Sequence, residues 1–171
     1  MVCGSAALPV SLLNTWQEIS GHILLERYGM SETGMILSNS YDGERFAGCV
    51  GKALPGVEVQ LIDDSGNKIQ NPGSAGEILV KGKTLFSHYF NKPEASAIAF
   101  NDEGWFFTGD LGEFDHQGIY KILGRKSTDI IKSGGYKISA LEIENVLLEN
   151  NLVSECAVIG LSDDEWGEAV A

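Results

Sequence analysis

Basic residues are scarce in this chain of 171 residues. Lysine and arginine together number 12, against 24 aspartate and glutamate residues, so the formal net charge at pH 7 is -12. Proteins that bind nucleic acids neutralise phosphates with clustered lysine and arginine side chains. The composition therefore argues against a nucleic-acid partner, and the acidic surface favours solubility.

Cysteine is also rare. Cys3, Cys49 and Cys156 are odd in number, far apart in the sequence and without CxxC spacing. This pattern argues against a disulfide framework and against a cysteine zinc site, and it is typical of inert thiols in a reducing compartment. We therefore expect a cytoplasmic protein.

Long hydrophobic runs are missing as well. No stretch approaches the ~20 apolar residues that a membrane span needs, and the first residues lack a basic region followed by an apolar run. The sequence thus predicts neither a membrane span nor a targeting segment. The chain does have a hydrophobic content of 43%, which is ordinary for a soluble protein that buries a core.

The first part of the chain, from Leu8 to Arg27, has the pattern of a helix followed by a strand. Apolar residues at helical spacing run up to Gly21, which ends the predicted helix, and the apolar run 22–26 predicts a short strand. We expect this strand to end immediately before Tyr28.

From Gly48 to Leu123 the sequence changes to short β-branched runs separated by turns. These runs predict strands at 57–62 and 76–81, and a hairpin over 112–123 that turns at Asp115 to Gly118. The aromatic run 105–107 predicts another strand, which we expect to end near Asp110.

Helical spacing returns after the β-rich region. Ser139, with Glu142 three residues later, predicts a capped amphipathic helix with Ile143, Val146 and Leu147 on its apolar face. The run 155–160 then predicts a strand. The fold class indicated by these patterns is mixed α/β.

One short motif, Tyr28-Gly-Met-Ser-Glu-Thr33, carries several groups suited to a nucleotide. An aromatic ring can stack a base, Gly29 lets the backbone come close, and the hydroxyl of Ser31 can donate to a phosphoryl oxygen. The carboxylate of Glu32 is an oxygen ligand of the kind that Mg²⁺ prefers. An isolated Tyr-Gly pair at the end of a strand more often simply caps a core.

Two further motifs follow downstream. The carboxylate of Asp110, after Thr108-Gly109, matches the two donors of a ribose diol, and Arg125 adds a guanidinium that can reach ribose or phosphate oxygens. Taken singly, a Gly-Asp turn and an arginine in a surface loop are the commoner interpretations. The order and spacing of all three motifs favour an adenylate site.

The whole chain resembles the AMP-forming acyl-CoA synthetases of the adenylate-forming superfamily. The resemblance implies a partial adenylate-forming enzyme fold, in which residues 1–123 are the C-terminal part of the large AMP-binding domain, with a β-rich subdomain at about 46–123. Residues 124–171 would be the hinge and the start of the small C-terminal lid domain. Four motifs carry the resemblance: Cys3-Gly-Ser-Ala-Ala-Leu-Pro9, Tyr28-Gly-Met-Ser-Glu-Thr33, Gly104-Trp-Phe-Phe-Thr-Gly-Asp110 and Gly124-Arg-Lys-Ser-Thr-Asp-Ile-Ile-Lys-Ser-Gly-Gly-Tyr-Lys-Ile-Ser139.

The resemblance also implies roles for individual residues, with ATP or AMP, Mg²⁺ and coenzyme A as cofactors or co-substrates. Such enzymes form an acyl-adenylate and pyrophosphate from ATP and an acid, and coenzyme A thiol then displaces AMP. By resemblance, Ser5, Ala6 and Ala7 line the adenine site, Tyr28 and Gly29 contact the base, Ser31 contacts the α-phosphate, Glu32 binds Mg²⁺, Asp110 and Arg125 hold the ribose, and Lys132, Gly134 and Gly135 lie in the segment that meets coenzyme A.

Arg27 bears on the identity of the acid. A guanidinium beside the acyl site favours a substrate with a second carboxylate, and the sequence around Arg27 is similar to malonyl-CoA synthetases. We therefore predict malonate as the substrate. Two alternatives remain: Arg27 pairs with Glu26, Glu32 or Glu44 as a structural ion pair, or the ligase takes another short-chain or dicarboxylic acid.

Two elements expected from the resemblance are not in the sequence. A glycine-, serine- and threonine-rich phosphate loop does not precede Met1, and the chain stops before the lysine that the family places near its C-terminus. We expect this chain to be an internal fragment, to be inactive alone, and to have the missing segments of the same enzyme as partners. The alternative is a non-catalytic nucleotide-binding remnant.

Overall fold

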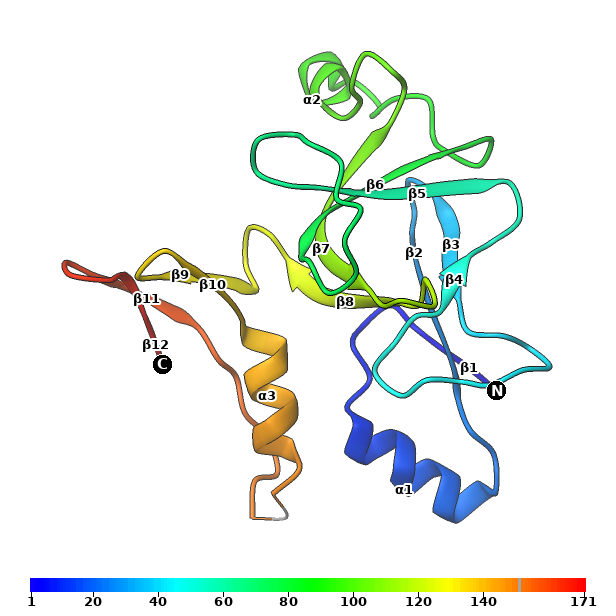
Figure 1. Cartoon of the computed structure of the whole chain (residues 1–171), viewed down its shortest axis with the longest axis vertical. Helices are drawn as coiled ribbons and strands as arrows, with labels where there is room; N and C mark the ends of the chain where they lie inside the picture. Colours follow the sequence, from blue (N-terminus) through cyan, green and yellow to red (C-terminus); the bar gives the residue numbers. More distant parts are fainter. Residues whose placement is uncertain (151) are drawn as a thin grey trace.

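Three four-stranded sheets organise the part of the chain that the structure describes, residues 1–150 and 152–171 of a computed structural model (Figure 1). The sheet orders are β1-β2-β3-β4, β5-β6-β7-β8 and β10-β9-β12-β11. The elements are β1 (Val2–Cys3), α1 (Val10–Ser20), β2 (Leu25–Met30), β3 (Gly34–Ser38), β4 (Lys52–Ala53), β5 (Val57–Ile62), β6 (Gly76–Gly82), α2 (Pro93–Ile98), β7 (Phe106–Phe114), β8 (Tyr120–Arg125), β9 (Ile130–Ser133), β10 (Tyr136–Ser139), α3 (Ala140–Leu148), β11 (Gly160–Asp163) and β12 (Gly167–Val170).

Helix α1 agrees with the predicted helix, whereas strand β2 differs from the predicted strand. Helix α1 ends at Gly21 as expected, and the N–H of Gly21 donates to the carbonyl of Gln17 at 2.8 Å. Strand β2, however, does not stop before Tyr28 but continues to Met30, because β3 folds back antiparallel and pairs Met30 with Gly34. A Cβ at Gly29 would lie 2.2 Å from the carbonyl oxygen of Gly34, so only glycine allows this close pairing.

The second sheet is an antiparallel meander that closely follows the sequence pattern. Strands β5 and β6 and the hairpin between β7 and β8 lie where they were predicted, and Asp115 accepts backbone hydrogen bonds from Gln117 and Ile119 in the turn. The prediction that a strand ends at Asp110 was wrong. Strand β7 continues to Phe114 because β8 pairs with it from Asp110 to Phe114, and this pairing sets Asp110 opposite Arg125.

The main core joins the first two sheets. Five side chains with almost no exposed surface form one cluster, and partly buried residues such as Tyr28 and Tyr120 pack around it. Burial of these apolar side chains fixes the position of β2 and β3 relative to the meander. The five are Ile36, Leu37, Leu61, Ile78 and Val80.

Helix α3 begins as predicted, whereas its apolar face differs from the prediction. The backbone N–H of Glu142 donates to the side chain of Ser139 at 3.2 Å, which is the expected N-cap. Ile143 packs against the small core of Ile131, Ala140 and Val158. Val146 and Leu147, in contrast, are 68% and 41% exposed, because the core under α3 reaches only as far as Ile143.

The strand predicted over 155–160 was also wrong, since regular pairing begins only at Gly160. The segment before Gly160 packs against α3 and does not pair with a strand. The backbone N–H of Val158 donates to the carboxylate of Glu144 at 2.8 Å, and the thiol of Cys156 contacts the carbonyl of Glu144. The first of these contacts occupies a backbone N–H that a sheet partner would otherwise take.

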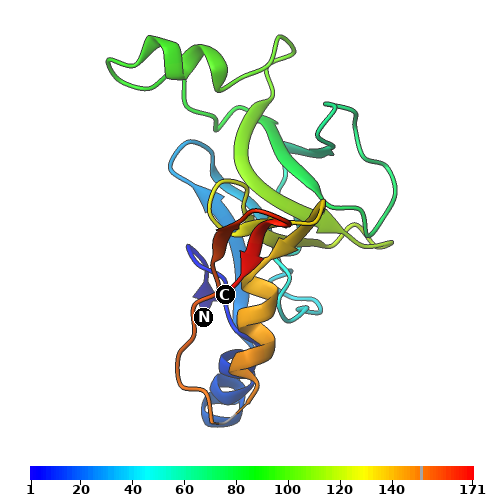
Figure 2. The same ribbon diagram turned by 90° about the vertical axis from the view of Figure 1, so that its left-hand side faces the viewer.

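Ion pairs connect the third sheet and α3 to the meander. Lys121 of β8 pairs with Glu142 of α3, and Lys137 of β10 pairs with Asp64 in the turn after β5. Figures 1 and 2 both place α1 and α3 at the same end of the molecule. No helix among the described residues is long and apolar enough to cross a membrane.

Candidate functional site

Asp110 lies at the centre of the candidate site and is held by two side chains. Because the register sets Asp110 of β7 opposite Arg125 of β8, the Nε of Arg125 lies 3.0 Å from Oδ1 of Asp110. The hydroxyl of Tyr28, from β2 in the other sheet, donates to Oδ2 of Asp110 at 2.5 Å. Three residues predicted separately from the sequence are therefore in direct contact.

Burial controls the electrostatics of this group. It raises the pKa of Asp110 above its ordinary value, although the Tyr28 hydroxyl and the Arg125 charge act in the opposite direction. Burial, followed by the nearby Asp110 charge, raises the pKa of Tyr28 far above its ordinary value. The Tyr28 hydroxyl is therefore a permanent donor near neutral pH.

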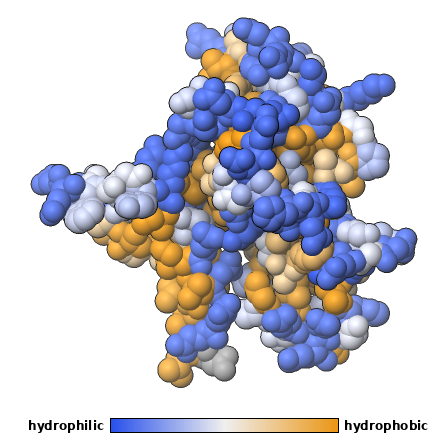
Figure 3. Space-filling model, in the orientation of Figure 1, coloured by the Kyte–Doolittle hydropathy of each residue, from blue (hydrophilic) through white to orange (hydrophobic). Residues whose placement is uncertain are grey.

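A cavity of about 590 Å³ opens beside these three residues. The space-filling view shows a narrow opening between the surface over α3 and the surface over α1 (Figure 3). The cavity is also lined by four residues that the resemblance assigns to the nucleotide: Ser5, Ala6, Ala7 and Gly29. A cavity of this size, with a few polar groups converging on it, is typical of a site for a small ligand.

Helix α3 forms a wall that the sequence analysis did not anticipate. Glu142, Asn145 and Val146 line the cavity together with Lys121 of β8. The exposed side of α3 thus faces the cavity, which accounts for the exposed position of Val146 outside the apolar core. The helix periodicity gave no signal for this role, because it depends on how α3 packs beside the meander.

Ser31 and Glu32 lie outside the cavity lining, in the turn between β2 and β3. Oε1 of Glu32 accepts a hydrogen bond from the hydroxyl of Tyr89 at 3.1 Å. No cluster of three or more metal-ligating side chains occurs within residues 1–150 and 152–171. A single carboxylate fits a magnesium ion held mainly by phosphate and water, but not one enclosed by protein ligands.

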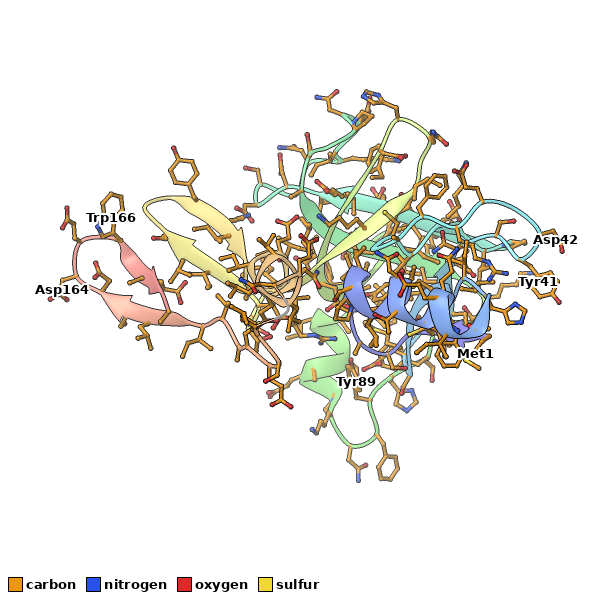
Figure 4. All side chains as sticks on the ribbon, turned by 90° about the horizontal axis from the view of Figure 1, so that it is seen from below. Met1, Tyr41, Asp42, Tyr89, Asp164 and Trp166 are labelled. Carbon is orange, nitrogen blue, oxygen red and sulfur yellow. The ribbon has the colours of Figure 1, made fainter. Side chains whose placement is uncertain are left out.

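Lys132, Gly134 and Gly135 are not brought to the cavity. They belong to β9 and the turn before β10, and the backbone N–H of Gly134 donates to the carbonyl of Trp166 at 2.8 Å. Figure 4 shows Trp166 at the outer end of the β11–β12 hairpin, well away from Tyr89, which is the hydrogen-bond partner of Glu32. The structure therefore separates the predicted coenzyme A segment from the predicted nucleotide residues.

Arg27 lines the first cavity and also a second one of about 710 Å³ on the other side of β2. Within the part of the chain that the structure describes, its guanidinium forms no ion pair, so the alternative of a structural pair with Glu26, Glu32 or Glu44 is not found. Arg27 is only half-buried, and its charge is available to a ligand.

Glu26 is a cavity residue that the sequence analysis considered only as a partner of Arg27. Its Oε1 accepts the backbone N–H of Gly48 at 3.1 Å, and its backbone carbonyl accepts hydrogen bonds from Asn39. Asn39 in turn donates to the carbonyl of Cys49 at 2.6 Å. Glu26 and Asn39 thus fix the loop that forms one wall of the cavity. In the sequence, the position of Glu26 in the apolar run 22–26 was the signal that could have identified it as a buried residue.

The pKa of Glu26 predicts a pH-dependent stability. Burial raises this pKa from 4.5 to about 7, against the lowering effect of the Gly48 N–H. Because the folded pKa exceeds the unfolded value, the stabilising contribution is full below pH 4.5 and is lost as the pH rises through 7. Between pH 5 and pH 8, unaltered protein should lose up to about 3 kcal/mol of unfolding free energy relative to Glu26→Gln.

Chemical denaturation of both proteins at the two pH values measures this difference. Glu18→Gln, on the exposed side of α1, is the matched control and should show no such pH-dependent gap. An equal gap at both pH values would show that Glu26 is already ionised when buried.

Comparison with known proteins identifies the family that carries this site. The model of the AMP-binding enzyme family matches residues 1–90, and the model of the AMP-binding enzyme C-terminal domain matches residues 142–171. This chain belongs to the AMP-binding enzyme family.

Several individual ligases are similar to this chain in sequence and structure. The malonate–CoA ligase of Arabidopsis thaliana is 51% identical over 170 residues, which are 99% of this chain and 27% of that protein. ATP-bound MatB from Rhodopseudomonas palustris is 42% identical with a TM-score of 0.92, over 99% of this chain and 33% of that one. A malonyl-CoA ligase with methylmalonyl-CoA and AMP bound is 49% identical with a TM-score of 0.69, over 99% of this chain and 36% of that one.

Two facts follow from these comparisons. The chain spans only about a third of the length of the relatives it matches. Its arrangement is also closer to the ATP-bound structure than to the complex with methylmalonyl-CoA and AMP, although the latter is more similar in sequence.

Proposed function

We propose that this chain forms the adenylate-binding part of an AMP-forming acid–CoA ligase and that malonate is the acid. The observation that carries the proposal is the contact of Tyr28 and Arg125 with Asp110 at the edge of the first cavity. The Asp110 carboxylate is an ionisable acceptor that can receive hydrogen bonds from the hydroxyls of a ribose. Ser5, Ala6 and Ala7 line the same cavity, which supports their assignment to the adenine ring.

The reaction has two balanced steps. A carboxylate oxygen of malonate forms a bond to the α-phosphorus of ATP while the bond from that phosphorus to pyrophosphate breaks. The thiolate sulfur of coenzyme A then bonds to the carbonyl carbon of malonyl-adenylate, and the bond from that carbon to the oxygen of AMP breaks. The role of Asp110 and Arg125 in both steps is to hold the ribose, so that the reacting phosphate keeps one position.

Malonate is supported by Arg27. Its guanidinium is half-buried, lines the cavity and has no carboxylate partner within the described part of the chain. A guanidinium in such a position gains most from a bidentate carboxylate. Malonate keeps one free carboxylate after the other has joined AMP, and the malonate–CoA ligase of Arabidopsis thaliana is among the chain's relatives.

Ser31 and Glu32 would act on the phosphate side of the nucleotide. The turn that carries them follows directly from Tyr28 and Gly29, so a nucleotide on those residues would extend its phosphates toward the turn. Glu32 would hold Mg²⁺ through the oxygen that Tyr89 leaves free, and a bound Mg²⁺ would neutralise phosphate charge. Ser31 is exposed and its hydroxyl can donate to a phosphoryl oxygen.

Residues 124–171 are proposed to move as a lid about a hinge after Arg125. Gly124 has a φ of 131°, and a Cβ there would lie 2.6 Å from the Cβ of Asp129, so the hinge turn requires glycine. The outward position of Gly134 and Gly135 supports a second arrangement in which this segment approaches coenzyme A. The higher TM-score against ATP-bound MatB supports assignment of the present arrangement to the adenylation step.

A segment exchange tests the proposed activity. Residues 1–171 would replace their counterpart in Rhodopseudomonas palustris MatB, which matches 99% of this chain at a TM-score of 0.92. We expect malonate-dependent release of pyrophosphate and formation of malonyl-CoA. The same exchange carrying Asp110→Asn is the control for the site and should lose about 100-fold of this activity.

The other outcomes separate the alternatives. Turnover of another short-chain or dicarboxylic acid, with none of malonate, would assign the chain to a ligase of different specificity. A folded exchange protein that binds AMP but releases no pyrophosphate with any acid would favour a non-catalytic nucleotide-binding protein.

A further inference from the structure

Each oxygen of the Asp110 carboxylate has its own side-chain partner. Tyr28 donates to Oδ2 at 2.5 Å, and Arg125 lies 3.0 Å from Oδ1. The Asp110 side chain is 8% exposed, whereas that of Arg125 is 52% exposed. The Arg125 contact therefore lies on the exposed side of the carboxylate, whereas the tyrosine contact lies in the buried part of the site.

We propose that the hydroxyl of Tyr28 is a positioning group that fixes the Asp110 carboxylate for the ribose, a role separate from stacking by the Tyr28 ring. The inference rests on the proposed adenylate site. The hydroxyl holds Oδ2 and so sets the rotamer of Asp110. Oδ1, which only the more exposed Arg125 contacts, is then directed to the ribose hydroxyls.

The backbone of Asp110 is fixed independently of Tyr28. The hydroxyl of Thr108 accepts the backbone N–H of Asp110 at 3.1 Å and donates to the carbonyl of Ile78 at 2.8 Å. The main chain of Asp110 is therefore fixed, and only its side-chain torsions can still vary. The Tyr28 hydroxyl is the buried contact that restricts those torsions.

The direction of the hydrogen bond is also determined. Burial and the Asp110 charge keep the pKa of Tyr28 far above the neutral range, so its oxygen carries a proton. The charged groups around Asp110 are Arg125, which lowers its pKa, and Asp129 and Glu77, which raise it. Glu77 is itself paired with Lys126 at 2.8 Å. Among these groups, the Tyr28 hydroxyl stabilises the ionised form of the Asp110 carboxylate.

Tyr28→Phe separates the two roles of the side chain, because phenylalanine keeps the ring and loses the hydroxyl. Affinities for AMP and for 2′,3′-dideoxy-AMP should be measured by calorimetric titration. Loss of positioning should reduce the preference for AMP over the dideoxy nucleotide by roughly tenfold or more, since a hydrogen bond to a charged group is involved. Affinity for the dideoxy nucleotide should change much less.

Tyr120→Phe is the matched control. Tyr120 is also partly buried in the main core, but it does not line the cavity. This variant should keep the preference of the unaltered chain. In the double variant Tyr28→Phe/Asp110→Asn, the preference should be no lower than in Asp110→Asn alone, because the hydroxyl acts through Asp110.

The pH profile gives a readout that a purely structural role would not move. AMP binding should weaken as the pH falls through the pKa of Asp110. Tyr28→Phe removes an interaction that lowers this pKa, so the weakening should begin at a higher pH in the variant than in the unaltered chain.

The outcomes are distinct. Equal loss of affinity for both nucleotides, or an unchanged preference, would overturn the positioning role while leaving AMP binding intact. Failure of the unaltered chain to bind AMP would overturn the adenylate site and the inference together. If Tyr28→Phe does not fold, the ¹³Cζ resonance of Tyr28 in the unaltered chain decides: it should follow the titration of Asp110, and a resonance that ignores this titration overturns the inference.

Discussion

Asp110→Asn should weaken AMP binding by about 100-fold, because the ribose loses an ionised acceptor and Arg125 loses its ion-pair partner. The change is close to isosteric, so the cavity keeps its shape. It also removes a buried ionisable group whose pKa is raised by burial, and the folded protein should not lose stability near neutral pH. Calorimetric titration with AMP measures the affinity, and thermal unfolding measures the stability.

Asp102→Asn is the matched control for the loss of one negative charge. Asp102 is exposed in the loop after α2 and does not line the cavity, so AMP affinity should remain at the level of the unaltered chain. If Asp110→Asn binds AMP as tightly as the unaltered chain does, the ribose is not held by Asp110 and the site must be placed elsewhere.

Arg27→Ala should remove the preference for a malonyl group over an acetyl group. A bidentate pair between a guanidinium and the free carboxylate of malonyl-adenylate is worth roughly 10- to 100-fold in affinity, and the acetyl analogue has no such carboxylate. The variant should bind the two non-hydrolysable adenylate analogues with nearly equal affinity. Its affinity for AMP should stay unchanged, because Arg27 lies on the acyl side of the proposed site.

Two further variants sharpen this test. Arg27→Lys keeps the charge but loses the planar pair of donors, and it should retain only part of the preference. Lys92→Ala removes an exposed positive charge before α2, outside the cavity, and should leave the preference intact. A preference for the malonyl analogue that survives Arg27→Ala would assign the recognition of the second carboxylate to another group.

The sequence was informative where short motifs coincide with strand pairing. Tyr28, Asp110 and Arg125 were selected for their chemical groups, and the structure brings all three together. Their distances depend on facts that the motifs do not encode: β7 and β8 set Asp110 opposite Arg125, and the shared core of two sheets carries Tyr28 to them. The motif chemistry was predictable, while the register was not.

Elements whose structure depends on side chains from other segments were less predictable. The apolar run 155–160 looked like a strand, but Glu144 of α3 takes the backbone N–H of Val158. Val146 looked like a core residue and lies at the cavity instead, because Glu142 pairs with Lys121 and sets α3 against β8. Local patterns do not report such contacts between distant segments.

We propose that this chain contains a preformed site for an adenylate of a dicarboxylic acid. Calorimetric titration of the unaltered chain with non-hydrolysable malonyl-adenylate and acetyl-adenylate analogues tests it most directly. We expect that both analogues bind and that the malonyl analogue binds more tightly, by roughly 10-fold or more. Equal affinity would contradict the assignment of malonate, and absence of binding by both analogues would contradict the adenylate site itself.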